Sequence, residues 1–154
     1  MHSDPHETTR PAPKREATRT FPARLTILPE TAAFVEGFCA DHGMSRGDTL
    51  RLVLIVEELV SNTIAHGHGD ECDAPITLVL CGVPEGVALR YEDTAPAFDV
   101  AAALPDAARP LDTSLDARIV GGLGLRLLAH FSDSVRHARE DGCNRVWLTL
   151  RRTG

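Results

Sequence analysis

The chain has 154 residues, of which 43% are hydrophobic and 25% charged, with a formal net charge of −6. These values are typical of one globular domain, and the acidic charge argues against a protein that binds nucleic acid by neutralising phosphates. No segment reaches the roughly 18–20 apolar residues of a membrane span, and the start of the chain lacks the apolar core of a signal peptide. We therefore expect a cytoplasmic protein with neither a nucleic-acid nor a membrane partner.

The beginning of the chain predicts a disordered tail and then an edge strand. Residues 1–20 are rich in Pro, Thr, Arg and Glu and carry almost no hydrophobic side chains, which is typical of disorder. From Phe21 to Ile27, hydrophobic residues alternate with other residues at a period of two, which predicts a strand. The folded domain is accordingly expected over residues 21–152.

Two helices are predicted next. Pro29 can occupy the first turn of a helix, and the apolar residues after it are spaced by three and four, which predicts a helix over 30–41. Ser45 can cap a second helix over 46–66, which is expected to end before Gly67.

Two β-hairpins complete the predicted fold. Residues 76–83 and 87–93 flank a short turn with Pro and Gly, and Asp141-Gly142 separates two further β-rich runs. Between the hairpins, residues 94–120 lack periodicity and predict a lid, followed by a short helix. This order predicts an α+β fold: a two-layer sandwich whose mixed, mostly antiparallel sheet is covered on one face by helices.

The second predicted helix carries the first pattern that indicates chemistry. Glu58, Asn62 and His66 are spaced i, i+4, i+8 and therefore share one helix face. A carboxylate one turn before an amide offers oxygen ligands that suit Mg²⁺, and the carboxylate can accept a proton. The alternative is a polar stripe on a solvated helix face, which is the commoner case for such a stripe taken alone.

The second pattern is Asp93, at the end of a predicted strand. In an apolar pocket this carboxylate could accept a hydrogen bond from the exocyclic amine of adenine, and Phe98, beyond the turn at Pro96, could help to form the pocket wall. The alternative is an aspartate that begins a turn.

The third pattern is Gly121-Gly122-Leu123-Gly124, directly before the last predicted helix. Glycines at a helix start let backbone N–H groups face a phosphate, and the helix dipole favours the negative charge. A flexible turn explains the same residues, because a glycine cluster alone is weak evidence. Arg109 and Arg118 in the predicted lid could also reach phosphates, although exposed loop arginines are common.

Taken in order, the three patterns resemble the ATP-binding domain of the GHKL superfamily (Bergerat fold), over residues 21–152. The compact size is similar to that of bacterial anti-sigma-factor serine/threonine kinases. This resemblance implies a histidine-kinase-like ATP-binding fold with ATP and Mg²⁺, in which Glu58 is the general base and Asn62 the Mg²⁺ ligand. The nucleotide-binding residues that it implies are Asn62, Asp93, Ala95, Phe98, Gly121, Gly122, Leu123 and Gly124.

The sequence departs from that family at two places. Ala95 stands where relatives usually have Gly, and Cys143-Asn144 stands near the position where many relatives have Gly-Thr, with the Thr close to adenine. Thr149 lies further along the same strand.

The implied function is phosphorylation of an anti-sigma-factor antagonist, which controls a sigma factor by partner switching. One alternative is an ATP-binding module that sequesters its partner without transfer. Another is the catalytic half of a histidine kinase, but the chain is too short for a dimerising phospho-acceptor helix pair as well.

The resemblance also allows a homodimer through the first helix, with Phe34 and Phe38 on its apolar face. We interpret the crowded residues 66–72 as a polar loop rather than a metal site.

Overall fold

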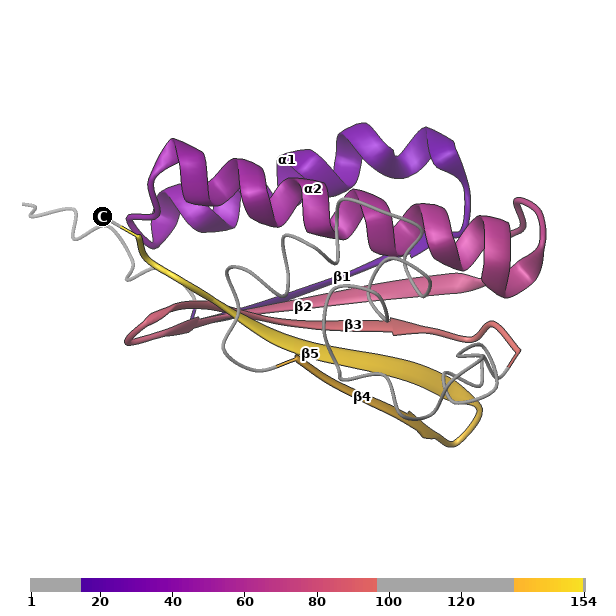
Figure 1. Cartoon of the computed structure of the whole chain (residues 1–154). Coiled ribbons are helices and arrows are strands. Elements are labelled where there is room, and N and C mark those ends of the chain that lie inside the picture. Colours follow the sequence, from indigo (N-terminus) through magenta and orange to yellow (C-terminus); the bar gives the residue numbers. More distant parts are fainter. Residues whose placement is uncertain (1–14, 97–134, 154) are drawn as a thin grey trace, which may run out of the picture.

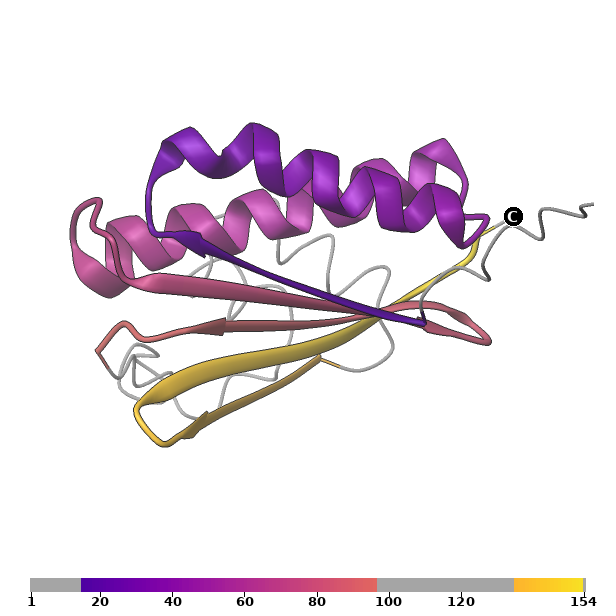
Figure 2. The same ribbon diagram turned by 180° about the vertical axis from the view of Figure 1, so that it is seen from behind.

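The computed structural model describes residues 15–96 and 135–153. These residues form two layers, with two helices lying together on one face of a sheet (Figure 1). Figure 2 shows the same arrangement from behind, with the opposite face of the sheet free of helices among the described residues. The two-layer α+β architecture predicted from the sequence is therefore confirmed.

The sheet has five strands: β1 (Glu16–Pro22), β2 (Pro75–Val83), β3 (Gly86–Asp93), β4 (Val135–Glu140) and β5 (Cys143–Arg151). Their order is β1-β2-β3-β5-β4, and every pairing among these strands is antiparallel. Both predicted hairpins are present. The second turns at Asp141-Gly142, where both residues have positive φ angles of 53° and 77°, as a two-residue hairpin turn requires.

The helical layer consists of α1 (Leu28–Asp41) and α2 (Arg46–Asn62). The Ser45 hydroxyl accepts a hydrogen bond from the Asp48 N–H at 3.1 Å, so the predicted cap of α2 is confirmed. The end of this helix differs from the prediction, because the chain continues beyond α2 as the π-helix η2 (Thr63–His68). Among the described residues, no helix is long and apolar enough to cross a membrane.

The start of the fold also differs from the prediction. Strand β1 begins at Glu16, within the segment expected to be a disordered tail, and it ends at Pro22. Residues Leu25–Ile27, expected to continue a strand, form the short 3₁₀ helix η1. Here the Leu25 N–H donates to the Glu71 carboxylate at 2.7 Å, and the Ile27 N–H donates to the Arg24 carbonyl at 3.1 Å instead of to a neighbouring strand.

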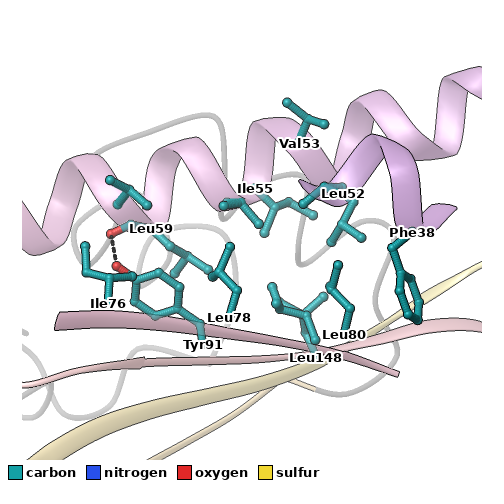
Figure 3. Close-up of a cluster of buried hydrophobic side chains, with 14 of the residues drawn as sticks. Phe38, Leu52, Val53, Ile55, Leu59, Ile76, Leu78, Leu80, Tyr91 and Leu148 are labelled. Atoms are coloured by element: carbon teal, nitrogen blue, oxygen red, sulfur yellow. Dashed lines mark hydrogen bonds between the residues drawn. The ribbon is translucent and has the colours of Figure 1, made fainter. Parts of the chain in front are cut away.

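The hydrophobic core lies between the two layers (Figure 3). Helix α2 contributes Leu52 and Ile55, and β2 contributes Leu78 and Leu80, all of them fully buried. At one end of this core the Tyr91 hydroxyl donates to the Leu59 carbonyl at 3.2 Å, the bond drawn in Figure 3. That end of the helix–sheet interface is polar, and the candidate site lies beside it.

The apolar face of α1 is largely used within the molecule. Phe38 is buried and stacks on His42 with ring centroids 4.0 Å apart. Phe34 meets Phe21 edge to face at 6.4 Å. Phe38 is thus part of the core, whereas Phe34 is only partly buried, and the homodimer stays a prediction.

Candidate functional site

A pocket opens where the end of α2 and η2 face strands β3, β4 and β5. Its wall combines apolar side chains with a few polar groups, as in small-molecule sites. The residues that line it are Leu59, Asn62, Thr63, His66, Gly67, Tyr91, Asp93, Ala95, Pro96, His137, Asn144 and Val146.

Asp93 is the buried charged group of this pocket, with 7% of its surface exposed. Its Oδ1 accepts from the Ala95 N–H at 3.0 Å and from the Asn144 amide at 2.8 Å. Its Oδ2 accepts from the Thr63 hydroxyl at 2.8 Å. Three donors from three parts of the chain thus hold the carboxylate in one orientation, as the burial of a charge requires.

Asn144 and Arg139 connect this carboxylate to the second hairpin. The Asn144 amide nitrogen also donates to the Ala95 carbonyl at 3.0 Å. The Arg139 guanidinium donates to the Asn144 Oδ1 at 2.9 Å and to the Ala95 carbonyl at 3.0 Å. The turn that follows β3 is therefore bound to both strands of that hairpin.

The π-helix η2 forms the opposite wall. Its wider turn places Thr63, His66 and Gly67 on the pocket, and such segments often occur at functional sites. A Cβ atom on Gly67 would lie 2.8 Å from the Cβ of Ala95, which is too close for a side chain. Only glycine permits this approach of η2 to the turn after β3.

Asn62 provides a test of whether the pocket fits a nucleotide. Its amide nitrogen is buried, and the part of the chain that the structure describes offers it no hydrogen-bond partner. A buried donor without a partner costs free energy unless a ligand satisfies it. The phosphate and ribose oxygens of a nucleotide are suitable acceptors, and the amide oxygen of the same side chain is a ligand type that Mg²⁺ accepts. The residues present therefore fit the expected group.

Two further side chains of the pocket have shifted pKa values. Burial raises the pKa of the Tyr91 hydroxyl well above its ordinary value; its hydrogen bond with Thr63 opposes this shift and the charge of Asp93 adds to it. Desolvation lowers the pKa of His137, against the opposing effect of Asp93. The pocket therefore favours the protonated phenol and the neutral imidazole.

The structure brings together three of the residues expected from the sequence. Asn62, Asp93 and Ala95 all line the pocket. His66 lies on the same wall, as its spacing from Asn62 predicts. Glu58 is half-buried on α2, one turn before Asn62, and does not form part of the wall.

The other expected positions lie outside the described residues. These are Phe98, Gly121, Gly122, Leu123, Gly124, Arg109, Arg118 and most of the predicted lid. In the segment 66–72, Glu71 binds a backbone N–H of η1. Within residues 15–96 and 135–153, no group of three His, Cys, Asp or Glu side chains could hold a metal ion.

Sequence reasoning gave no functional role to several residues of this site. Thr63 was predicted only as part of the second helix, which was expected to end before Gly67. Asn144 was noted only as a departure from Gly-Thr, yet it lies directly opposite Asp93 in the β3–β5 register. The predicted turn at Asp141-Gly142 places Arg139 opposite Asn144, but the sequence does not indicate that this pair lies beside Asp93.

Comparison with known proteins gives a consistent assignment. The histidine kinase-like ATPase domain family matches residues 21–150. Serine/threonine-protein kinase BtrW of Bordetella bronchiseptica is 36% identical over 98 residues, 64% of this chain and 67% of the relative. Serine-protein kinase RsbW of Listeria monocytogenes is 25% identical over 131 residues, 84% of this chain and 83% of the relative.

A solved structure shares the fold. The crystal structure of the RsbU and RsbW domains of a Mycobacterium tuberculosis protein matches with a TM-score of 0.60 at 17% identity, covering 90% of this chain. The match spans 32% of that longer chain, so this chain is comparable to about a third of it. Together these matches confirm the resemblance inferred from the sequence motifs, including the histidine-kinase-like fold.

Proposed function

The chain belongs to the histidine kinase-like ATPase domain family, and on that premise we propose that it is an ATP-dependent serine/threonine protein kinase. Its protein substrate is an anti-sigma-factor antagonist, and phosphorylation of this antagonist controls a sigma factor by partner switching. The relatives named as serine/threonine-protein and serine-protein kinases support the reaction class. The compact domain, similar to anti-sigma-factor kinases, supports the choice of partner.

The observation that carries this proposal is the buried Asp93 in a pocket that also contains an unsatisfied Asn62 amide. A buried carboxylate beside apolar side chains accepts a hydrogen bond from an exocyclic amine and disfavours a base that presents a carbonyl there. Asn62 lines the same pocket, and we propose that its amide meets the oxygen-rich part of the nucleotide.

Asn62 is the residue that would hold Mg²⁺, through its amide oxygen. When bound, this ion neutralises charge on the phosphates during transfer. Glu58, one helical turn earlier, is proposed as the general base. In the transfer, a serine or threonine oxygen of the substrate bonds to the γ-phosphorus of ATP, the bond from that phosphorus to the bridging oxygen breaks, and ADP leaves. Glu58 accepts the hydroxyl proton.

The effect on the partner is electrostatic. A phosphate on a serine or threonine adds close to two negative charges at neutral pH and can break an interface.

We place this reaction in the cytoplasm. The four cysteines of the chain are free thiols, as in a reducing compartment.

The experiment is transfer of label from γ-labelled ATP to antagonist domains encoded in the same genome. We compare the wild-type chain with Glu58→Gln, and use Glu57→Gln as the matched control. Glu57 carries the same group on the same helix but points about 100° away. We expect label on the substrate with the wild type and Glu57→Gln, and a loss of at least about 100-fold with Glu58→Gln.

Two outcomes would contradict the proposal. If ATP binds but no antagonist gains label, the chain acts as a sequestering module without transfer. If Glu57→Gln and Glu58→Gln lose transfer equally, Glu58 is not the specific base.

A further inference from the structure

We propose that Arg139 and Asn144 are positioning residues that make Asp93 the sole acceptor for the base of the nucleotide, and so set selectivity for a base with an exocyclic amine. The inference rests on the proposed nucleotide site and assigns a role to Arg139 and to Asn144, which stands near the family's Gly-Thr position. It begins from their place in the sheet. Asp93 lies opposite Asn144 in β5, and Asn144 lies opposite Arg139 in β4, so the three residues form one row across three strands.

The orientation of the Asn144 amide follows from its neighbours. A guanidinium only donates hydrogen bonds, whereas a carboxylate and a backbone carbonyl only accept them. The amide oxygen must therefore face Arg139, at 2.9 Å, and the amide nitrogen must face Asp93 and the Ala95 carbonyl, at 2.8 and 3.0 Å. All three neighbours thus favour the same orientation, because the flipped amide would place an oxygen against the Asp93 carboxylate and the Ala95 carbonyl, and a nitrogen against Arg139.

The hydrogen bonds also restrict where a base can bind. The Ala95 carbonyl receives two donors, Asn144 at 3.0 Å and Arg139 at 3.0 Å, which fills both of its lone pairs. Asp93 Oδ1 likewise receives two donors, the Ala95 N–H and Asn144. Among the described residues, Asp93 Oδ2 receives one donor, Thr63. The free acceptor position of this row is therefore on Oδ2.

This arrangement has a consequence that a merely structural role would not have. If Arg139 is removed, the Asn144 amide oxygen loses its donor, and the Ala95 carbonyl regains a lone pair that competes with Oδ2. The binding free energy that is lost should come from recognition of the exocyclic amine rather than from binding of ribose and phosphates. Selectivity, not only affinity, should change.

The test uses calorimetry with two nucleotides, ATP and purine riboside 5′-triphosphate, which lacks the exocyclic amine. Wild type should prefer ATP by at least about 10-fold, since hydrogen bonds to charged groups are among the stronger ones. In Arg139→Ala and Asn144→Ala this preference should fall to within about threefold, mainly through weaker ATP binding.

The matched control is Arg136→Ala. Arg136 lies on the same edge strand and carries the same charge, but its guanidinium lies 4.2 Å from the centre of the Trp147 ring and does not line the pocket. This variant should keep the wild-type preference. Thermal unfolding of all variants checks that each of them folds. If Asn144→Ala does not fold, Arg139→Ala, on an exposed strand, still tests the selectivity for ATP.

The outcomes separate this inference from the proposed function. If Arg139→Ala folds and weakens both nucleotides equally, or keeps the full preference for ATP, the positioning role is wrong while the nucleotide site stands. If the wild-type chain binds neither nucleotide, the proposed function itself is wrong.

Discussion

Thr63 and Gly67 determine how closely the helical layer approaches the sheet at the pocket. The Thr63 hydroxyl lies 2.8 Å from Asp93 Oδ2, 2.5 Å from the Tyr91 hydroxyl and 3.0 Å from the Leu59 carbonyl. One proton on each hydroxyl serves this set if Thr63 donates to Asp93 and the Tyr91 proton is shared between the Thr63 oxygen and the Leu59 carbonyl. Gly67 then lets η2 pack on Ala95 without a side chain between them.

We expect Gly67→Ala to destabilise the fold by about 1–3 kcal/mol and to weaken ATP binding, because its Cβ would overlap that of Ala95 at 2.8 Å. Urea denaturation and calorimetry measure the two effects. Gly37→Ala is the control: Gly37 lies within α1 with no atom within 4 Å of an added Cβ, so alanine there should be neutral or slightly stabilising. Equal effects of the two changes would contradict the proposed close packing.

At the scale of the elements, the start of α2 is bound to the end of the chain. Asp48 is buried, with 1% of its surface exposed. Its carboxylate accepts from the Thr153 N–H at 3.0 Å, the Thr153 hydroxyl at 2.6 Å and Arg51 at 2.7 Å. The residues after β5 are thereby held against the helical layer, and the negative charge lies in the first turn of α2, where the helix dipole favours it.

This contact predicts a dependence of stability on pH. Burial alone would raise the pKa of Asp48, but hydrogen bonds from Thr153 and Ser45 and the charge of Arg51 outweigh it and hold the pKa below its ordinary value. The folded state therefore binds the proton less tightly than the unfolded state. The stabilisation is complete above the ordinary aspartate pKa of about 4 and is lost as the pH falls through the lower pKa of the folded state.

Accordingly, Asp48→Asn should lower the free energy of unfolding by about 1–3 kcal/mol at pH 7. The difference from wild type should shrink as the pH falls below about 4. Urea denaturation between pH 7 and pH 3 measures this, with the exposed Asp41→Asn as control. A difference that stays constant over this range would exclude the role of the Asp48 charge.

Prediction from sequence succeeded for elements with a strong local signal. The apolar spacing of α1, the Ser45 cap of α2 and the Asp141-Gly142 turn are each decided by neighbouring residues. Strand β1 gave no such signal, because Phe21 is its only fully buried residue and the others lie on the edge of the sheet. The π-helix was not predictable either, because the 3.6-residue pattern continues past Asn62.

The residues of the candidate site also divide into those with a local sequence signal and those without one. Asn62 and Asp93 were identified because each belongs to a short motif whose order along the chain is informative. Asn144 and Arg139 acquire their roles only through the antiparallel register that places them in one row with Asp93. The Arg139–Asn144 pair follows from the turn at Asp141-Gly142, but its place beside Asp93 depends on the pairing of β5 with β3, in which Asn144 and Asp93 are 51 residues apart along the chain.

For the whole molecule, stability depends on the apolar contact between the helical layer and the sheet (Figure 3). Leu52 is fully buried at this interface, whereas Leu50, two residues earlier on α2, is 57% exposed. Leu52→Ala should lower the free energy of unfolding by about 2–5 kcal/mol. The same change at Leu50 should stay within about 0.5 kcal/mol. Urea denaturation compares the two, and a similar cost at both positions would contradict the two-layer core.

The most direct measurement of the central claim is calorimetric titration of Mg-ATP into the wild-type chain and into Asp93→Asn. An asparagine has the size of the aspartate but replaces one acceptor oxygen by a donor, which would face Thr63 or Asn144 and Ala95. We expect micromolar binding by the wild type and a loss of at least about 10-fold in Asp93→Asn, because a hydrogen bond to a buried charge is lost. Wild-type protein that binds no Mg-ATP, or an Asp93→Asn variant that binds it equally well, would contradict the assignment of this pocket as the nucleotide site.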